Sequence, residues 1–84
     1  MQNFRKRIRI DDNYPEFFFN KIYTVIGIKY HLSVLDINQI PHFFYMEEVV
    51  SEFRLMEASK LPQWIQNAEQ KLSLAIIDNA AKFN

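Results

Sequence analysis

Apolar residues recur at helical spacing near the end of the chain, and this pattern predicts one amphipathic helix over residues 60–82. Apolar side chains three and four positions apart lie on one face of an α-helix, which then packs on a core. Ser59 suits the N-cap and Pro62 the first turn, where a backbone N–H has no intrahelical partner. Polar residues between the apolar ones, Ser73 among them, are expected to lie away from the core. The expected core stripe comprises Leu61, Trp64, Ile65, Ala68, Leu72, Ala75, Ile76 and Phe83.

A second set of apolar residues interrupts the polar side of this helix. Leu74, Ile77 and Ala81 are spaced i, i+3 and i+7. At about 100° per residue they fall nearly opposite Leu61 and Leu72. Two interpretations are open: the helix contacts a second protein chain through these residues, or the protein's own sheet and N-terminal segment enclose the helix on both sides. The first interpretation makes the three residues a candidate partner interface.

Earlier parts of the chain alternate between apolar and polar residues, which is typical of β-strands. Gly27, the only glycine, is expected at a tight reversal of the chain. The clearest alternation follows it over residues 28–35, with Ile28, Tyr30, Leu32 and Val34 expected inward and Lys29, His31 and Ser33 outward. The other expected strands cover residues 4–10, 17–26, 43–48 and 52–56, the last two joined by a turn near Val50 and Ser51.

Five strands followed by one helix favour an α+β fold, a small antiparallel meander sheet of four to five strands with the C-terminal helix packed on one face. Residues 1–84 are expected to form a single domain, because the chain has no linker, repeat or low-complexity segment. One helix cannot cover both faces of such a sheet. The alternative is a strongly curled sheet, close to a half-barrel, that encloses its aromatic residues. The aromatic residues expected partly on the uncovered face, a second reason to expect self-association, are Phe17, Phe19, Tyr23, Phe43 and Tyr45.

Composition narrows the functional classes. Hydrophobic residues make up 49% of the chain and aromatic residues 15%, which excludes a disordered protein. Ten basic and ten acidic residues give a formal net charge of zero, so no overall field attracts the protein to nucleic acid or anionic lipid. Cysteine is absent, which removes disulfides, thiol catalysis and thiolate metal sites. Without an apolar leader or a membrane-spanning run, a cytoplasmic protein with no membrane contact is the expectation.

Candidate catalytic and metal-binding residues are few. His31 and His42 are eleven residues apart, and with Glu47 they show no recognised ligand spacing, so no metal site is expected. Ser33 lies two residues after His31 on the same face of its strand, but nothing marks a third residue that would orient the pair. A single glycine excludes a glycine-rich phosphate loop. We therefore expect a protein that is not an enzyme and uses no cofactor.

The first predicted strand carries the strongest indication of nucleic-acid binding. Arg5, Arg7 and Arg9 share one side of it. Positions two apart along a strand are separated by about 6.6 Å, close to the phosphate spacing of a single strand. Aromatic side chains on an exposed sheet can stack on bases. The other interpretation is an edge strand whose charges prevent edge-to-edge aggregation.

Together these patterns favour a small non-catalytic protein-binding or regulatory module, with a second copy of itself as the first expected partner. Leu74, Ile77 and Ala81 are the candidate contacts. Another protein on the same surface fits the pattern as well. Single-stranded nucleic acid bound by Arg5, Arg7 and Arg9 is the alternative.

Overall fold

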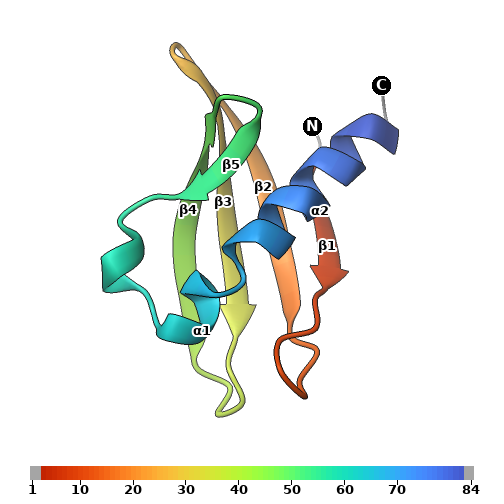
Figure 1. Ribbon diagram of the computed structural model, residues 1–84, viewed down its shortest axis with the longest axis vertical. Helices are drawn as coiled ribbons and strands as arrows, with labels where there is room; N and C mark the ends of the chain where they lie inside the picture. The colour runs from red at the N-terminus through yellow and green to blue at the C-terminus, as the bar shows by residue number, and fades with distance from the viewer. Residues whose placement is uncertain (1–2, 83–84) are drawn as a thin grey trace.

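The computed structural model describes residues 3–82 and contains one five-stranded antiparallel sheet with the helices on one face (Figure 1). Neighbouring strands in the sheet are also neighbours in the chain, in the order β1-β2-β3-β4-β5. This arrangement confirms the expected α+β meander. The strands are β1 (Phe4–Arg7), β2 (Glu16–Thr24), β3 (Gly27–Leu35), β4 (Pro41–Val49) and β5 (Glu52–Leu55).

Two tight turns join the strands at one end of the sheet. Between β2 and β3 the turn residues are 25–26, so Gly27, at φ 145°, is the first residue of β3 rather than the turn itself. Thr24 Oγ1 donates a hydrogen bond to Gly27 O at 2.7 Å across this turn. Val50 and Ser51 have φ of 47° and 68° and reverse the chain between β4 and β5. Positive φ at both central residues is characteristic of the type I′ hairpin turn, so the turn expected there is confirmed.

Strand β1 is shorter than the expected residues 4–10 and ends at Arg7. Ile8 N–H still donates to Pro15 O at 3.1 Å. Pro15 has no N–H to return a second bond, so the regular ladder stops here. Beyond this point only an isolated bridge joins Ile10 to Asn13.

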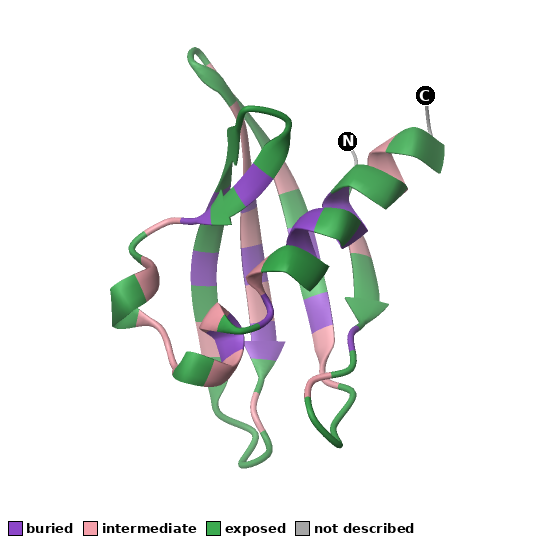
Figure 2. Ribbon diagram, in the orientation of Figure 1, coloured by how far each residue is buried: buried purple, intermediate pink, exposed green. Residues whose placement is uncertain are grey.

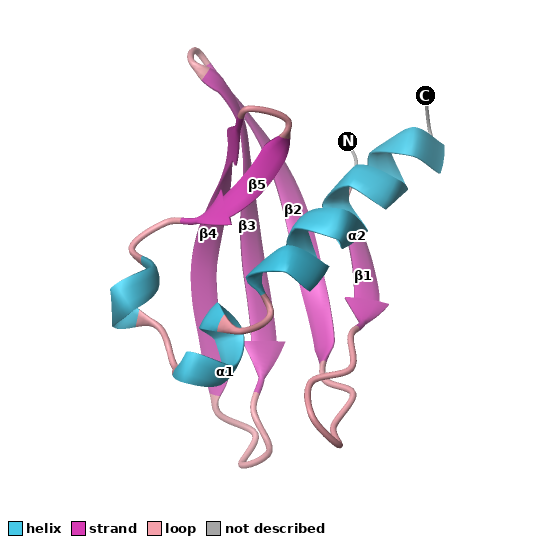
Figure 3. Ribbon diagram, in the orientation of Figure 1, coloured by secondary structure: helices cyan, strands magenta, loops and turns pink. Residues whose placement is uncertain are grey.

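The expected single helix over residues 60–82 is divided into three segments (Figure 3): the 3-10 helix η1 (Ala58–Lys60), the one-turn α1 (Gln63–Gln66) and α2 (Glu69–Lys82). Ser59 lies inside η1 and is not an N-cap, so that prediction was wrong. Pro62, which has extended backbone at ψ 147°, precedes α1. A proline lacks the N–H of a helix interior and disfavours a helical residue before it, and Leu61 is indeed extended. Phe83 of the expected stripe lies outside the described residues.

The core lies between α2 and the sheet face that α2 covers. In Figure 2 the buried positions gather along the middle of the strands and on the side of α2 that faces them. The alternation predicted for β3 is confirmed, because Tyr30, Leu32 and Val34 are buried. Trp64 is only partly buried, with its ring centre 6.5 Å from that of Phe17. Ile65 of α1, Ala68 of the turn between the two helices, and Leu72, Ala75 and Ile76 of α2 complete this core.

Candidate functional site

The sheet face turned away from α2 carries a cluster of aromatic side chains. Phe18 on β2, His31 on β3, and Phe43 and Tyr45 on β4 all point to this face, because each is offset by one residue from buried core positions. The His31 ring stacks on Phe43, with centres 5.9 Å apart and planes 11° apart, and lies 5.1 Å from the Tyr45 ring. Phe43 is 63% exposed. We call Phe18, His31, Phe43 and Tyr45 the aromatic patch.

The sequence prediction for β2 placed the wrong phenylalanines on this face. Phe17 and Phe19 are both 0% exposed, and the exposed ring is that of Phe18. The strand register gives the reason, since Phe17 pairs with Val34, which points into the core. The turn at residues 25–26 sets this register, so the position of the turn decides that Phe18 is the exposed ring. The curled sheet encloses Phe17 and Phe19, whereas Phe43 and Tyr45 are exposed on the uncovered face. Tyr23 is exposed too, but it lies on the same side of β2 as Phe17 and Phe19, so its expected face was wrong.

Charged residues flank the aromatic patch. Lys29 Nζ lies 5.6 Å from the centre of the Tyr45 ring, a favourable cation–π position. Arg5 is the register partner of Phe18, and its Nε lies 3.9 Å from Glu16 Oε2. The patch is therefore aromatic at its centre and of mixed charge at its rim, which is the usual composition of a protein interface.

The predicted partner interface on the helix faces solvent on the opposite side of the molecule. Leu74 is 64% exposed, and Ile77 and Ala81 are exposed too, so the protein's own sheet does not enclose them. Leu74 and Ile77 line a shallow groove between α2 and β5, together with Phe53 and Ser73. The aromatic patch and this helix surface are thus two separate candidate interfaces.

The three arginines proposed to contact nucleic acid are exposed, but each already contacts its own chain. Arg7 Nη1 donates to Tyr14 O at 3.0 Å, and Arg9 Nε donates to Asp11 O at 3.1 Å. Arg5 makes the long ion pair described above. Arg5 and Arg7 project from β1 beside the aromatic patch, while Arg9 lies beyond the end of β1. Each guanidinium retains further N–H donors for a ligand.

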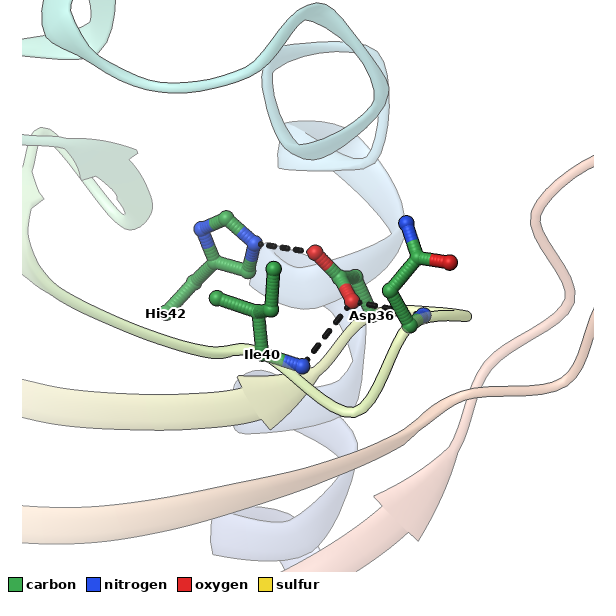
Figure 4. Close-up of polar contacts among 4 residues, drawn as sticks. Asp36, Ile40 and His42 are labelled. Carbon is green, nitrogen blue, oxygen red and sulfur yellow. Dashed lines mark hydrogen bonds and ion pairs between the residues drawn. The ribbon is translucent and has the colours of Figure 1, made fainter.

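An aspartate–histidine pair organises the loop between β3 and β4 (Figure 4). Asp36 Oδ2 lies 3.0 Å from His42 Nε2, and Asp36 Oδ1 accepts the backbone N–H groups of Asn38 at 2.8 Å and Ile40 at 3.0 Å. These hydrogen bonds, first that of His42, hold the pKa of Asp36 below its ordinary value. The His42 ring also packs edge-on against Trp64 at 5.7 Å. The sequence signal for this arrangement was an aspartate at the start of a loop, where its side chain caps backbone N–H groups.

The two histidines lie on opposite faces of the sheet. His31 pairs with Tyr45 on the open face, whereas His42 pairs with Val34 on the covered face. The metal site that sequence reasoning weighed, from His31, His42 and Glu47, is therefore not assembled. Within residues 3–82, no three or more His, Cys, Asp or Glu side chains are arranged to hold a metal ion.

A cavity of about 740 Å³ opens at the end of the sheet, between the loop after β1 and the loop after β3. Its volume lies in the range of small-molecule sites. Tyr14, Phe18 and Trp64 contribute rings to its lining, and the charged lining residues are Arg7, Asp11, Glu16 and Asp36. Arg7 and Asp36 already hydrogen-bond to the loops that form the cavity, so part of their bonding capacity holds those loops together. The aromatic patch is the stronger candidate site.

Comparisons with protein-family models, with curated proteins and with solved structures returned no match for this chain. None of the helices within residues 3–82 combines the length and the apolar character needed to cross a bilayer.

Proposed function

We propose that this protein is a small non-catalytic binding module that forms a homodimer through the aromatic patch. The observation that carries this proposal is the cluster of Phe18, His31, Phe43 and Tyr45 on three adjacent strands of an open sheet face. Large contiguous apolar surfaces are uncommon on monomers. Packing the patch against a second copy removes apolar surface from water, which stabilises the pair by about 25 cal/mol for each Å² buried.

The open face has the dimensions that a dimer interface needs. Strands β2, β3 and β4 have nine residues each, which at about 3.3 Å per residue makes the face about 30 Å long. Five strands spaced about 4.8 Å apart make it about 20 Å wide where the four-residue strands β1 and β5 flank the others. This footprint is comparable with the roughly 800 Å² that each partner buries in a standard interface. Two such faces can pack as the layers of a β-sandwich do.

The charge distribution around the aromatic patch favours a second copy of the chain as its binding partner. The formal net charge of the chain is zero, and the strands carry neighbouring charges of opposite sign. Arg5 lies near Glu16, and Arg54 Nη2 lies 3.1 Å from Glu52 Oε2. A two-fold interface brings the same surface of both copies together, so a uniformly charged rim would repel itself. The mixed rim avoids that repulsion.

Sedimentation and light scattering from micromolar to millimolar concentration test the dimer. The expected mass is twice the 10.1 kDa of the chain. Phe43→Glu should give a folded monomer, because Phe43 contributes an exposed ring to the patch and its replacement puts an unpaired charge in the interface. Leu74→Glu, a matched change on the exposed side of α2, should leave the dimer intact.

Two results would reject this interface. A wild-type monomer at every concentration would remove the dimer altogether. Dissociation by Leu74→Glu but not by Phe43→Glu would move the interface to the helix surface of Leu74, Ile77 and Ala81.

Single-stranded nucleic acid is the second candidate ligand of the same face. The positions of Arg5 opposite Phe18 and of Lys29 over Tyr45 favour it, because a basic groove with stacking rings binds such strands. The zero net charge and the contacts of Arg7 and Arg9 with their own chain favour the dimer instead.

A further inference from the structure

The helix α2 closes one edge of the sheet. Ser73 Oγ accepts the backbone N–H of Phe53 at 2.9 Å, and Glu69 Oε2 accepts that of Leu55 at 2.8 Å. These are the N–H groups on the outer side of β5, away from β4. With both groups occupied by α2, another strand cannot pair with them.

The opposite edge, at β1, is open along part of its length. Ile8 N–H donates inward to Pro15 O, and N–H groups alternate in direction from one residue of an antiparallel strand to the next. The N–H groups of Arg5 and Arg7 therefore point outward from the sheet. Within residues 3–82, no hydrogen bond of α2 reaches the backbone of Arg5 or Arg7.

Further along this edge, α2 holds the chain that follows β1. Lys71 Nζ donates to Arg9 O at 2.7 Å. This bond is consistent with the same alternation, since Arg9 O points outward like the N–H groups of Arg5 and Arg7. The open part of the edge is therefore confined to β1 itself.

Positive charge lines this open edge. Arg5, Lys6 and Arg7 are consecutive and exposed, and Arg9 follows. Glu16 is the acidic residue near them. Its Oε2 lies 3.9 Å from Arg5 Nε, and the Arg5 side chain is 70% exposed. A strand added beside β1 would place its side chains within about 5 Å of Arg5 and Arg7. Carboxylates at those positions would pair with both guanidinium groups.

We propose that the outer edge of β1 binds an acidic peptide segment in extended conformation, which adds to the sheet as a sixth strand. The backbone N–H groups of Arg5 and Arg7 bind its carbonyl groups, and alternate acidic side chains pair with the two guanidinium groups. The peptide residue between these two acidic residues lies opposite Lys6. This site is on the sheet edge and the aromatic patch is on the sheet face, and Arg5 lies at both. The variants described below therefore separate the two interactions.

A labelled peptide of alternating glutamate and threonine is the probe, and fluorescence anisotropy measures its binding. The glutamate peptide should bind, added salt should weaken it, and an alternating lysine–threonine peptide should not bind. Amide exchange followed by NMR gives the specific readout. Binding should protect the N–H groups of Arg5 and Arg7 and leave those of Phe53 and Leu55 unchanged.

Variants locate the site. The double change Arg5→Gln and Arg7→Gln should weaken binding about tenfold, the scale of two exposed ion pairs. The matched control, Arg54→Gln with Lys82→Gln, removes two exposed charges elsewhere and should leave the affinity within about twofold. Phe43→Glu should still bind the peptide whether or not the protein dimerises, which separates this proposal from the dimer.

Three results would overturn the proposal. The first is equal binding of the lysine peptide. The second is the absence of protection at the Arg5 and Arg7 N–H groups, with or without binding of the glutamate peptide. The third is tighter binding of a single-stranded oligonucleotide than of the glutamate peptide at the same salt, which would identify the basic strand as a phosphate-binding surface.

Discussion

The hydroxyl of Ser73 on α2 accepts the backbone N–H of Phe53 on the edge strand β5 at 2.9 Å. Glu69, four residues earlier on the helix, accepts the N–H of Leu55, two residues later on the strand. Four residues of helix rise about 6.0 Å, and two residues of strand span about 6.7 Å. Because these distances nearly match, one side of the helix satisfies successive outward N–H groups of the strand.

Replacing Ser73 should therefore destabilise the protein out of proportion to the size of its side chain. Ser73→Ala leaves the Phe53 N–H without its acceptor in a buried position, and we expect the free energy of unfolding to fall by about 1–3 kcal/mol. Urea unfolding measures it. Ser59→Ala, at an exposed position, is the control. Equal stabilities of the two variants would show that the hydrogen bond contributes nothing.

Replacing Leu72 or Trp64 by alanine compares the stability contributed by a fully buried side chain with that contributed by a partly buried one. Leu72 is 0% exposed, so Leu72→Ala should lower the free energy of unfolding by about 2–5 kcal/mol. Trp64 is partly buried, so Trp64→Ala should cost less than the roughly 3–5 kcal/mol of a fully buried ring. Urea unfolding measures both, with tryptophan fluorescence for Leu72→Ala and circular dichroism for Trp64→Ala. We expect the smaller loss for Trp64→Ala, because its ring is only partly buried. A larger loss of unfolding free energy for Trp64→Ala than for Leu72→Ala would contradict this expectation.

Asp36 should make stability depend on pH in the acid range. Its folded-state pKa is lowered from 3.8, first by the hydrogen bond with His42. A lowered carboxyl pKa contributes stability that is complete above the unfolded value and is lost as the pH falls through the folded value. The stabilisation that ionised Asp36 gives the wild type relative to Asp36→Asn should thus be lost as the pH falls below about 4. Urea unfolding at a series of pH values tests this. A difference that stays constant down to the acid-unfolded state would contradict it.

Oligonucleotide titrations at several salt concentrations test the alternative ligand of the sheet face. Three phosphates neutralised by Arg5, Arg7 and Arg9 would give a log–log salt slope of about −2. Changing all three to Ser should abolish that slope and leave the fold intact, because these side chains are exposed. Under the dimer proposal we expect no measurable binding of single-stranded RNA or DNA at physiological salt. Salt-sensitive binding that the triple change abolishes would instead support the nucleic-acid ligand.

The sequence by itself determined the strands, their meander order and most of the core. Alternation over residues 28–35 identified the buried side of β3, and helical spacing identified Leu72 and Ile76 as core residues. These features are predictable because burial on one side of a strand or helix imposes a period that is local in sequence. The basic side of β1 was predictable for the same reason. So was the exposed stripe of Leu74, Ile77 and Ala81.

Only the tertiary structure decided which phenylalanine of β2 faces solvent, where the long helical segment is interrupted, and what Ser73 does. Phe17, Phe18 and Phe19 are identical residues, so their own sequence cannot assign them to a face. The register across the turn at residues 25–26 assigns them, because a shift of one residue moves every side chain to the other face. Ser73 appears polar and exposed in the helical pattern, yet it is buried because the curled sheet brings β5 alongside α2. Such contacts join residues that are distant in sequence, so the local spacing of apolar residues does not predict them.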